Sequence, residues 1–152
     1  MSYDRKKTIR TQAKWQAEQE YTHFGTAMFK YGHNLTDVEV VKALNRLFNG
    51  IDREIYSSKD VNNGMRVQRM VYVERGRSRN NLHSHFFYKA ESSEQANDIE
   101  KIAKDIWLNK INKSHSLVIL PNTQHDNRNS YAMKEHYFVD DDIHQPHLTV
   151  IR

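Results

Sequence analysis

The chain has 152 residues, of which 38% are hydrophobic and 28% are charged, and its formal net charge is +4. This length is sufficient for one domain with a buried core. The absence of cysteine excludes disulfide scaffolds, thiolate zinc sites and cysteine nucleophiles, so any metal must be bound by histidine and carboxylate. No apolar stretch approaches the roughly 20 residues that span a membrane, and no apolar segment follows the charged first residues, so we expect a cytoplasmic protein without a membrane partner.

The N-terminal segment, residues 1–22, is polar and contains several basic residues. We interpret it as a basic arm that contacts nucleic acid, and a flexible terminus is the alternative. Residues 23–152 contain no linker, repeat or low-complexity tract. We therefore expect them to form a single domain.

Two segments at the start of this domain have clear patterns. Residues 23–29 combine aromatic and β-branched side chains, which predicts a strand. Thr36 and Glu39 have the spacing of a capping box, which predicts that a helix begins here. Apolar residues then recur at helical spacing as far as Ile55, so this helix should pack against the core.

A predicted hairpin follows, with strands near residues 67–74 and 82–89. Ser92 or Ser93 can cap a second amphipathic helix, and residues 117–120 predict another strand. The order strand, helix, strand, strand, helix, strand is that of the split βαβ arrangement. We expect an α+β domain, ferredoxin-like or RRM-like, whose antiparallel sheet carries the helices on one face and the active site on the other.

A pair of histidines on the predicted hairpin is the strongest candidate site. His83 and His85 are two residues apart on a strand, so their side chains point to the same face. Folding of the hairpin brings Glu74, at the end of the first strand, roughly opposite them. Two imidazoles and a carboxylate can hold a divalent cation and leave positions open for a phosphate oxygen. The alternative is a hydrogen-bonded or surface histidine pair without a metal.

Basic residues crowd the turn of the hairpin, at Arg75, Arg77 and Arg79. Positive charge beside a candidate phosphate site is typical of nucleic-acid binding, and a solvated surface is the alternative.

Tyr131 and Lys134 are three residues apart on a predicted short helix, which places both on one helical face. A tyrosine hydroxyl is a poor nucleophile unless a nearby cation stabilises the phenolate. Lys134 can serve in this way, or it can neutralise charge that develops on a phosphate. The sequence is compatible with both roles.

Three motifs, taken in chain order, resemble those of the HUH endonucleases, the nicking domains of rolling-circle replication initiators. The first is the strand at residues 23–29, the second is the His-x-His pair with its upstream acid, and the third is the Tyr-x-x-Lys pattern. Ser84 departs from the bulky apolar residue that the family usually has between the histidines. Tyr137 lies six residues beyond Tyr131 and leaves a two-tyrosine mechanism open, although no lysine follows it at the same spacing.

The resemblance implies metal-assisted transesterification on single-stranded DNA, at an origin or a hairpin. Tyr131 would form a 5′-phosphotyrosine and release a 3′-hydroxyl, with Mg²⁺ or Mn²⁺ on His83, His85 and Glu74. The implied function is sequence-specific nicking and joining that initiates rolling-circle replication, at the host-cell site of replicon DNA replication. A helicase or other replication proteins would be partners, and the chain would act as a monomer or a weak dimer.

The resemblance also implies contacts with the DNA. The three arginines of the hairpin turn would hold backbone phosphates. Thr26 and Met28 would line the substrate path. Base stacking would fall to aromatic residues of the hairpin, with Tyr72, Phe87 and Tyr88 as candidates.

Three other functions are compatible with the sequence. A small HUH-type single-strand DNA transposase would share the chemistry but act as a dimer on hairpin ends. A hydrolytic metallonuclease would use the same three ligands to activate water and would leave no covalent adduct. A non-catalytic ferredoxin-like module for single-stranded nucleic acid would stack bases on its sheet and need no divalent cation.

Overall fold

The computed structural model describes residues 7, 10, 11, 14, 15, 18–30, 34–75, 82–122 and 148–150. The elements of the described residues are β1 (His23–Phe29), α2 (Asp37–Asn62), β2 (Arg69–Glu74), β3 (His83–Tyr88), α3 (Ser93–Asp105), the π-helical segment η2 (Ile106–Lys110) and β4 (Ser114–Pro121).

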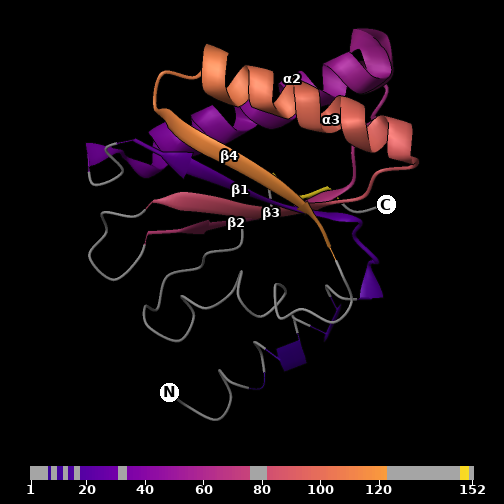
Figure 1. Cartoon of the computed structure of the whole chain (residues 1–152), viewed down its shortest axis with the longest axis horizontal. Helices are drawn as coiled ribbons and strands as arrows, with labels where there is room; N and C mark the ends of the chain where they lie inside the picture. The colour runs from indigo at the N-terminus through magenta and orange to yellow at the C-terminus, as the bar shows by residue number, and fades with distance from the viewer. Residues whose placement is uncertain are drawn as a thin grey trace.

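The four strands form one antiparallel sheet in the order β2-β3-β1-β4. Helices α2 and α3 lie together on one face of this sheet (Figure 1). The strand order and the one-sided helices confirm the predicted α+β, ferredoxin-like arrangement. The opposite face of the sheet is therefore the one that can carry a site.

Helix α2 begins as its sequence predicts. The side chain of Thr36 accepts a hydrogen bond from the Glu39 backbone at 3.2 Å, and the Glu39 carboxylate accepts one from the Thr36 backbone at 2.8 Å. The helix continues beyond Ile55 to Asn62, with one break at Ser57, where φ is 70°. Its buried side chains face the sheet and are mainly Val40, Leu44, Leu47, Phe48 and Ile51.

Helix α3 is capped by Ser92, whose side chain accepts a hydrogen bond from the backbone of Gln95. Its apolar face buries Ala96, Ile99 and Ala103, as expected of an amphipathic helix. The π-helical segment η2 follows directly and buries Trp107, whose indole nitrogen donates to the carbonyl of Ser116 at 2.9 Å. This bond ties the end of the helical layer to β4.

Alternation along the strands separates two apolar clusters. Val71, Val73 and Phe86 belong to the cluster under the helices. A second, smaller cluster on the opposite face consists of Tyr21, Phe24, Met70, Tyr72 and Phe87. Both faces of β2 and β3 are buried, so any polar group on these strands must find its partners inside the protein.

Close packing fills the space over Gly25 on the helix side of the sheet. A Cβ atom at Gly25 would lie 2.2 Å from Cζ of Phe86, closer than any real contact. The Phe86 ring thus occupies the space above β1 that a side chain at position 25 would need.

The C-terminal residues 148–150 lie against the outer edge of β2. Val150 and Arg69 exchange two backbone hydrogen bonds, of 2.8 and 2.9 Å, as an isolated antiparallel bridge. In the described part of this segment, Val150 is the residue that forms the bridge. Among the described residues, no helix is both long and apolar enough to cross a membrane.

A buried ion pair joins this edge to α2. Arg69 donates from one guanidinium nitrogen to both carboxylate oxygens of Asp52 at 3.0 Å, and its Nε donates to the carbonyl of Leu148 at 3.0 Å. The backbone of Val67 also donates to Asp52, at 2.9 Å. Asp52 is fully buried, yet hydrogen bonds and a permanent cation satisfy its carboxylate.

Candidate metal centre

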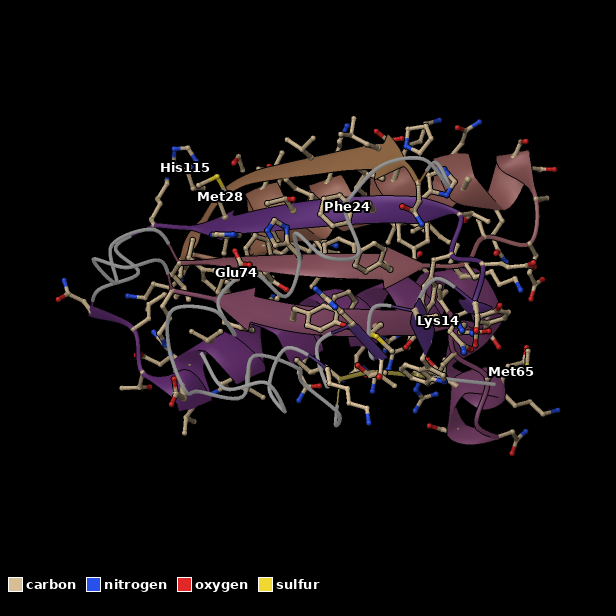
Figure 2. The ribbon with its side chains drawn as sticks, turned by 90° about the horizontal axis from the view of Figure 1, so that it is seen from below. Lys14, Phe24, Met28, Met65, Glu74 and His115 are labelled. Carbon is tan, nitrogen blue, oxygen red and sulfur yellow. The ribbon has the colours of Figure 1, made fainter. Side chains whose placement is uncertain are left out.

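Three side chains meet where β2 ends and β3 begins. In the antiparallel register, Glu74 is the partner of His83, and Tyr72 is the partner of His85. Because side chains alternate along a strand, Glu74, His83 and His85 all project from the face opposite the helices. Phe24, Met28 and Glu74 share this face of the sheet (Figure 2). The prediction that the hairpin brings Glu74 opposite the histidines agrees with this register.

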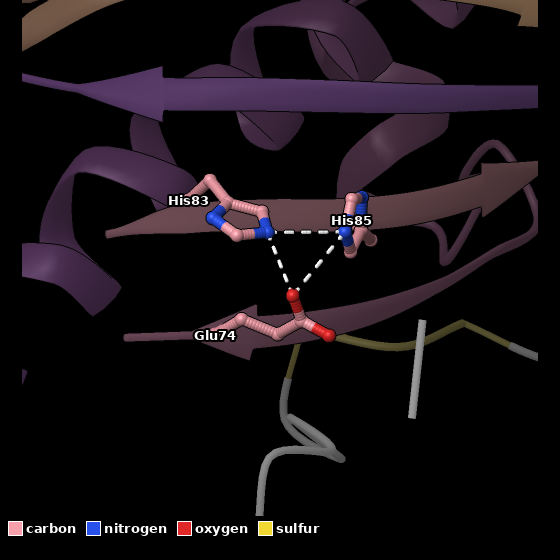
Figure 3. A group of neighbouring side chains, drawn as sticks. All are labelled: Glu74, His83 and His85. Atoms are coloured by element: carbon pink, nitrogen blue, oxygen red, sulfur yellow. Dashed lines mark hydrogen bonds and ion pairs between the residues drawn. The ribbon is translucent and has the colours of Figure 1, made fainter. Parts of the chain in front are cut away.

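The three donor atoms converge on one point (Figure 3). Oε2 of Glu74 lies 2.7 Å from Nε2 of His83 and 3.4 Å from Nε2 of His85. The two imidazole nitrogens are 3.1 Å apart. All three side chains are buried, with 0% of Glu74, 5% of His83 and 2% of His85 exposed.

These separations fit a metal ion. Donor atoms that surround one ion at about 2.1 Å, with angles of roughly 90° to 110°, lie about 3.0 to 3.4 Å apart. The distances of 3.1 and 3.4 Å fall in this range. The shortest, 2.7 Å, is that of a hydrogen bond, so without a cation a proton bridges His83 and Glu74. A metal ion would take the place of that proton, and the Glu74-His83-His85 group could thus bind a metal ion.

Glu74 is held in its charged form. Burial alone would raise the pKa of this carboxyl group, but hydrogen bonds and charge from His83 and His85 outweigh burial and lower the pKa to about 2. A metal ion at the site would therefore not compete with a proton on Glu74 near neutral pH.

His85 has a second layer of contacts. Its Nδ1 lies 3.1 Å from Oγ1 of Thr26, its partner in the β1–β3 register, and its ring stacks on Phe24 with centroids 5.2 Å apart. In the tautomer with the proton on Nδ1, His85 donates to Thr26, and the Nε2 lone pair faces the other two donors. A hydrogen bond of this kind orients a metal-binding histidine and fixes its tautomer.

Ser84, which departs from the HUH pattern, is fully buried on the helix side of β3. Its hydroxyl donates to the carbonyl of Tyr72 at 2.8 Å. A small polar residue is thus accommodated there because its one donor is satisfied, and the flanking histidines keep their positions.

Two of the predicted DNA contacts have other partners within the protein. Arg75 is half-buried and forms an ion pair with Asp37 at the start of α2. Tyr72 is fully buried, and its hydroxyl donates to the sulfur of Met70 at 2.9 Å. Phe87 and Tyr88 are buried as well, so no ring of these three tyrosine and phenylalanine residues presents a face to solvent.

Several predicted residues lie outside the described part of the chain: Tyr131, Lys134, Tyr137, Arg77 and Arg79. Their assigned roles stay predictions. The site as described therefore consists of the three donors, together with Thr26 and Phe24, which contact His85.

The contacts of Thr26 and Phe24 with His85 were not predicted from the sequence. A usable signal was present, because both residues alternate on the strand at residues 23–29. To predict the contacts from this alternation, one must also know that the strand pairs with β3, and no local sequence pattern specifies that pairing.

No protein-family model matches the chain, and neither does any curated protein or solved structure. The functional argument consequently depends on the residues of the site.

Proposed function

We propose that this protein is a metal-dependent nuclease that nicks and rejoins single-stranded DNA through a tyrosine nucleophile. The observation that supports the proposal most is the convergence of Glu74, His83 and His85 on the sheet face away from the helices. Three protein donors leave coordination positions for substrate oxygens, as catalytic metal sites do. The HUH-like order of motifs connects this centre to Tyr131.

The donor set favours Mn²⁺ over Mg²⁺. Imidazole nitrogen is a softer ligand than carboxylate or water, and Mg²⁺ prefers an all-oxygen octahedron. A bound ion would supply Lewis-acid polarisation of a non-bridging phosphate oxygen. Glu74 would retain its negative charge throughout, because its pKa of about 2 is far below neutral pH.

The covalent step assigned to Tyr131 balances as a transesterification. The phenolic oxygen loses its proton and forms a bond to phosphorus, the bond from phosphorus to the 3′-oxygen breaks, and the released 3′-oxygen takes up a proton and becomes the 3′-hydroxyl. Lys134 either favours the phenolate or neutralises charge on the phosphate. Attack by a 3′-hydroxyl on the phosphotyrosine reverses the step and joins strands.

The substrate class follows from charge and access. The net charge of +4 and the arginines near the hairpin favour a polyanion. A phosphate must reach a centre set in the face of a sheet, which is easier for an unpaired strand than for a duplex. Binding should weaken steeply with salt, because phosphate contacts release counterions.

The test is a search for a covalent adduct. The protein is incubated with Mn²⁺ and a mixed pool of end-labelled single-stranded oligonucleotides, and a denaturing gel is examined for a protein–DNA band. Tyr131→Phe and EDTA should both abolish the band. Tyr137→Phe is the matched control and should retain it.

Other outcomes would redirect the assignment. Cleavage that survives Tyr131→Phe without an adduct indicates a hydrolytic metallonuclease that uses the same three ligands. Binding of the pool without cleavage, and without any effect of EDTA, indicates a non-catalytic nucleic-acid-binding module. An adduct that forms only on hairpin ends, by a dimer, indicates a transposase.

A further inference from the structure

Exposure rises steadily across the sheet face that carries the metal centre. One row of paired residues runs from Tyr72 on β2 through His85 and Thr26 to Val118 on β4. Tyr72 is fully buried and His85 is 2% exposed, whereas Thr26 is half-buried and Val118 is 52% exposed. The centre is thus closed on the β2 side and becomes accessible toward β4.

The neighbouring row repeats this gradient. It runs from Met70 through Phe87 and Phe24 to Leu120, and exposure rises from 0% at Met70 to 42% at Leu120. Both rows of the register therefore indicate the same direction of approach. A substrate that reaches the donors would come over β1 and β4.

Two aliphatic side chains stand on this approach. Val118 and Leu120 are two residues apart on β4, so they project side by side on the face of the metal centre, while Leu117 and Ile119 pack under the helices. Adjacent strands are about 4.8 Å apart, which places the Cα atom of Val118 about 10 Å from that of His85. We call Val118 and Leu120 the β4 shelf.

We infer that the β4 shelf contacts the unstacked bases of the single strand whose phosphate lies at the metal centre. This inference rests on the proposed function. A single-stranded nucleic acid is charged along its backbone and apolar on its base faces, so it can place a phosphate at the donors and bases on the shelf. The shelf extends directly from the centre through Thr26, its partner in the register.

The size of the shelf argues against a protein occupant. Two partly exposed aliphatic side chains cover a small fraction of the roughly 1,000 Å² that a stable protein interface requires. A single nucleobase covers an area of their own size. A second copy of this chain, paired along β4, is the occupant that the test must distinguish.

The first experiment uses the absence of cysteine. Val118→Cys and Leu120→Cys each introduce a single thiol, and Leu108→Cys is the matched control. Leu108 is similarly exposed, at 48%, but lies on η2 in the helical layer. The rate of reaction with a fluorescent maleimide is measured in low salt, with and without a random-sequence single-stranded DNA pool. The pool should slow labelling at positions 118 and 120 at least about fivefold, and leave position 108 unchanged.

The second experiment measures affinity. Val118→Ser with Leu120→Ser should weaken binding of the pool about tenfold in fluorescence anisotropy, because base burial against the shelf is lost. Leu108→Ser should have no effect. Metal binding, followed by calorimetry, should be unchanged in both variants, because neither contacts the donors.

Each outcome has a separate meaning. Equal protection at all three thiols, or unchanged affinity of the double serine variant, overturns the β4 shelf while leaving the metal centre intact. Protection that appears without DNA and increases with protein concentration assigns the shelf to a second copy. If the wild-type chain binds neither Mn²⁺ in calorimetry nor the DNA pool in anisotropy, the proposed function is overturned. This outcome depends on the wild-type measurements only, so it is distinct from failure of the β4 shelf.

Discussion

Two buried carboxylates at opposite ends of β2 differ in the cations that face them. At the start of β2, Asp52 receives hydrogen bonds from the Arg69 guanidinium and the Val67 backbone. At its end, the partners described for Glu74 are the imidazoles of His83 and His85. Arginine is always charged, whereas imidazole gains and loses its proton near neutral pH. The first site is a permanent structural pair, and the second has donors that an exchangeable cation can use.

The largest expected effect breaks the structural pair. Asp52→Asn leaves the buried Arg69 without its counter-charge and should reduce the free energy of unfolding by about 3 kcal/mol in denaturant titration. Glu54→Gln, at an exposed acid of the same helix, should change it by less than about 0.5 kcal/mol. If the free energy of unfolding of Asp52→Asn equals that of the wild type, the ion pair between Asp52 and Arg69 does not stabilise the fold.

Removal of the charge at the other end of β2 should affect metal binding instead. Glu74→Gln should weaken Mn²⁺ binding about 100-fold in titration calorimetry, because a charged ligand becomes a neutral amide. Its melting temperature without metal should fall much less than that of Asp52→Asn. Asp98→Asn, at an exposed acid of α3, is the control for net charge. Equal Mn²⁺ affinities for both variants would exclude Glu74 as a ligand.

A smaller effect should come from substitution of Thr26, whose hydroxyl contacts Nδ1 of His85. Thr26→Val removes the hydroxyl that His85 contacts and should weaken Mn²⁺ binding about tenfold, with Thr26→Ser restoring the affinity. Thr22→Val is a matched control, because Thr22 makes the same kind of contact with Nδ1 of His23, at 2.8 Å, away from the donors. A loss of affinity that serine does not restore would point to packing rather than to the hydrogen bond.

The smallest effect is that of pH on metal binding. Mn²⁺ affinity should fall severalfold between pH 7.5 and pH 6.5, because protons compete for the imidazole nitrogens. Glu74 contributes nothing to this change, because its pKa, lowered to about 2, keeps it ionised throughout. Calorimetry in buffers of different ionisation enthalpy counts the protons released. An Mn²⁺ affinity that does not change across this pH range, with no protons released on binding, would exclude the imidazoles as ligands.

Local sequence patterns predicted the bounds of elements that are marked by a capping box or by a distinct change in composition. The strand at residues 23–29 has the bounds of β1, and the capping box at Thr36 marks the start of α2. Boundaries without such signals differ. Helix α2 continues seven residues past Ile55 through polar sequence, and β4 begins at Ser114 rather than near Leu117. Polar segments follow the tertiary packing, which composition alone does not specify.

The residues of the site also differ in how far the sequence predicts them. The alternation of His83 and His85, and the hairpin opposite Glu74, were predictable because all three residues belong to one local unit. The contact from Thr26 joins strands 59 residues apart, and the pairing of Asp52 with Arg69 joins a helix to a strand across 17 residues. A lone aspartate on a helix resembles a solvated residue until its partner in space is known.

The close approach of Gly25 to Phe86 also limits how the sequence can vary. A side chain at position 25 would displace the buried Phe86 ring, which packs edge-on against Phe48 of α2, and Phe86 is the neighbour of His85 on β3. In a saturation-mutagenesis library selected for metal binding, position 25 should accept no other residue, although glycine has no group that touches the centre. The least replaceable residue near the centre would then be one without a functional group.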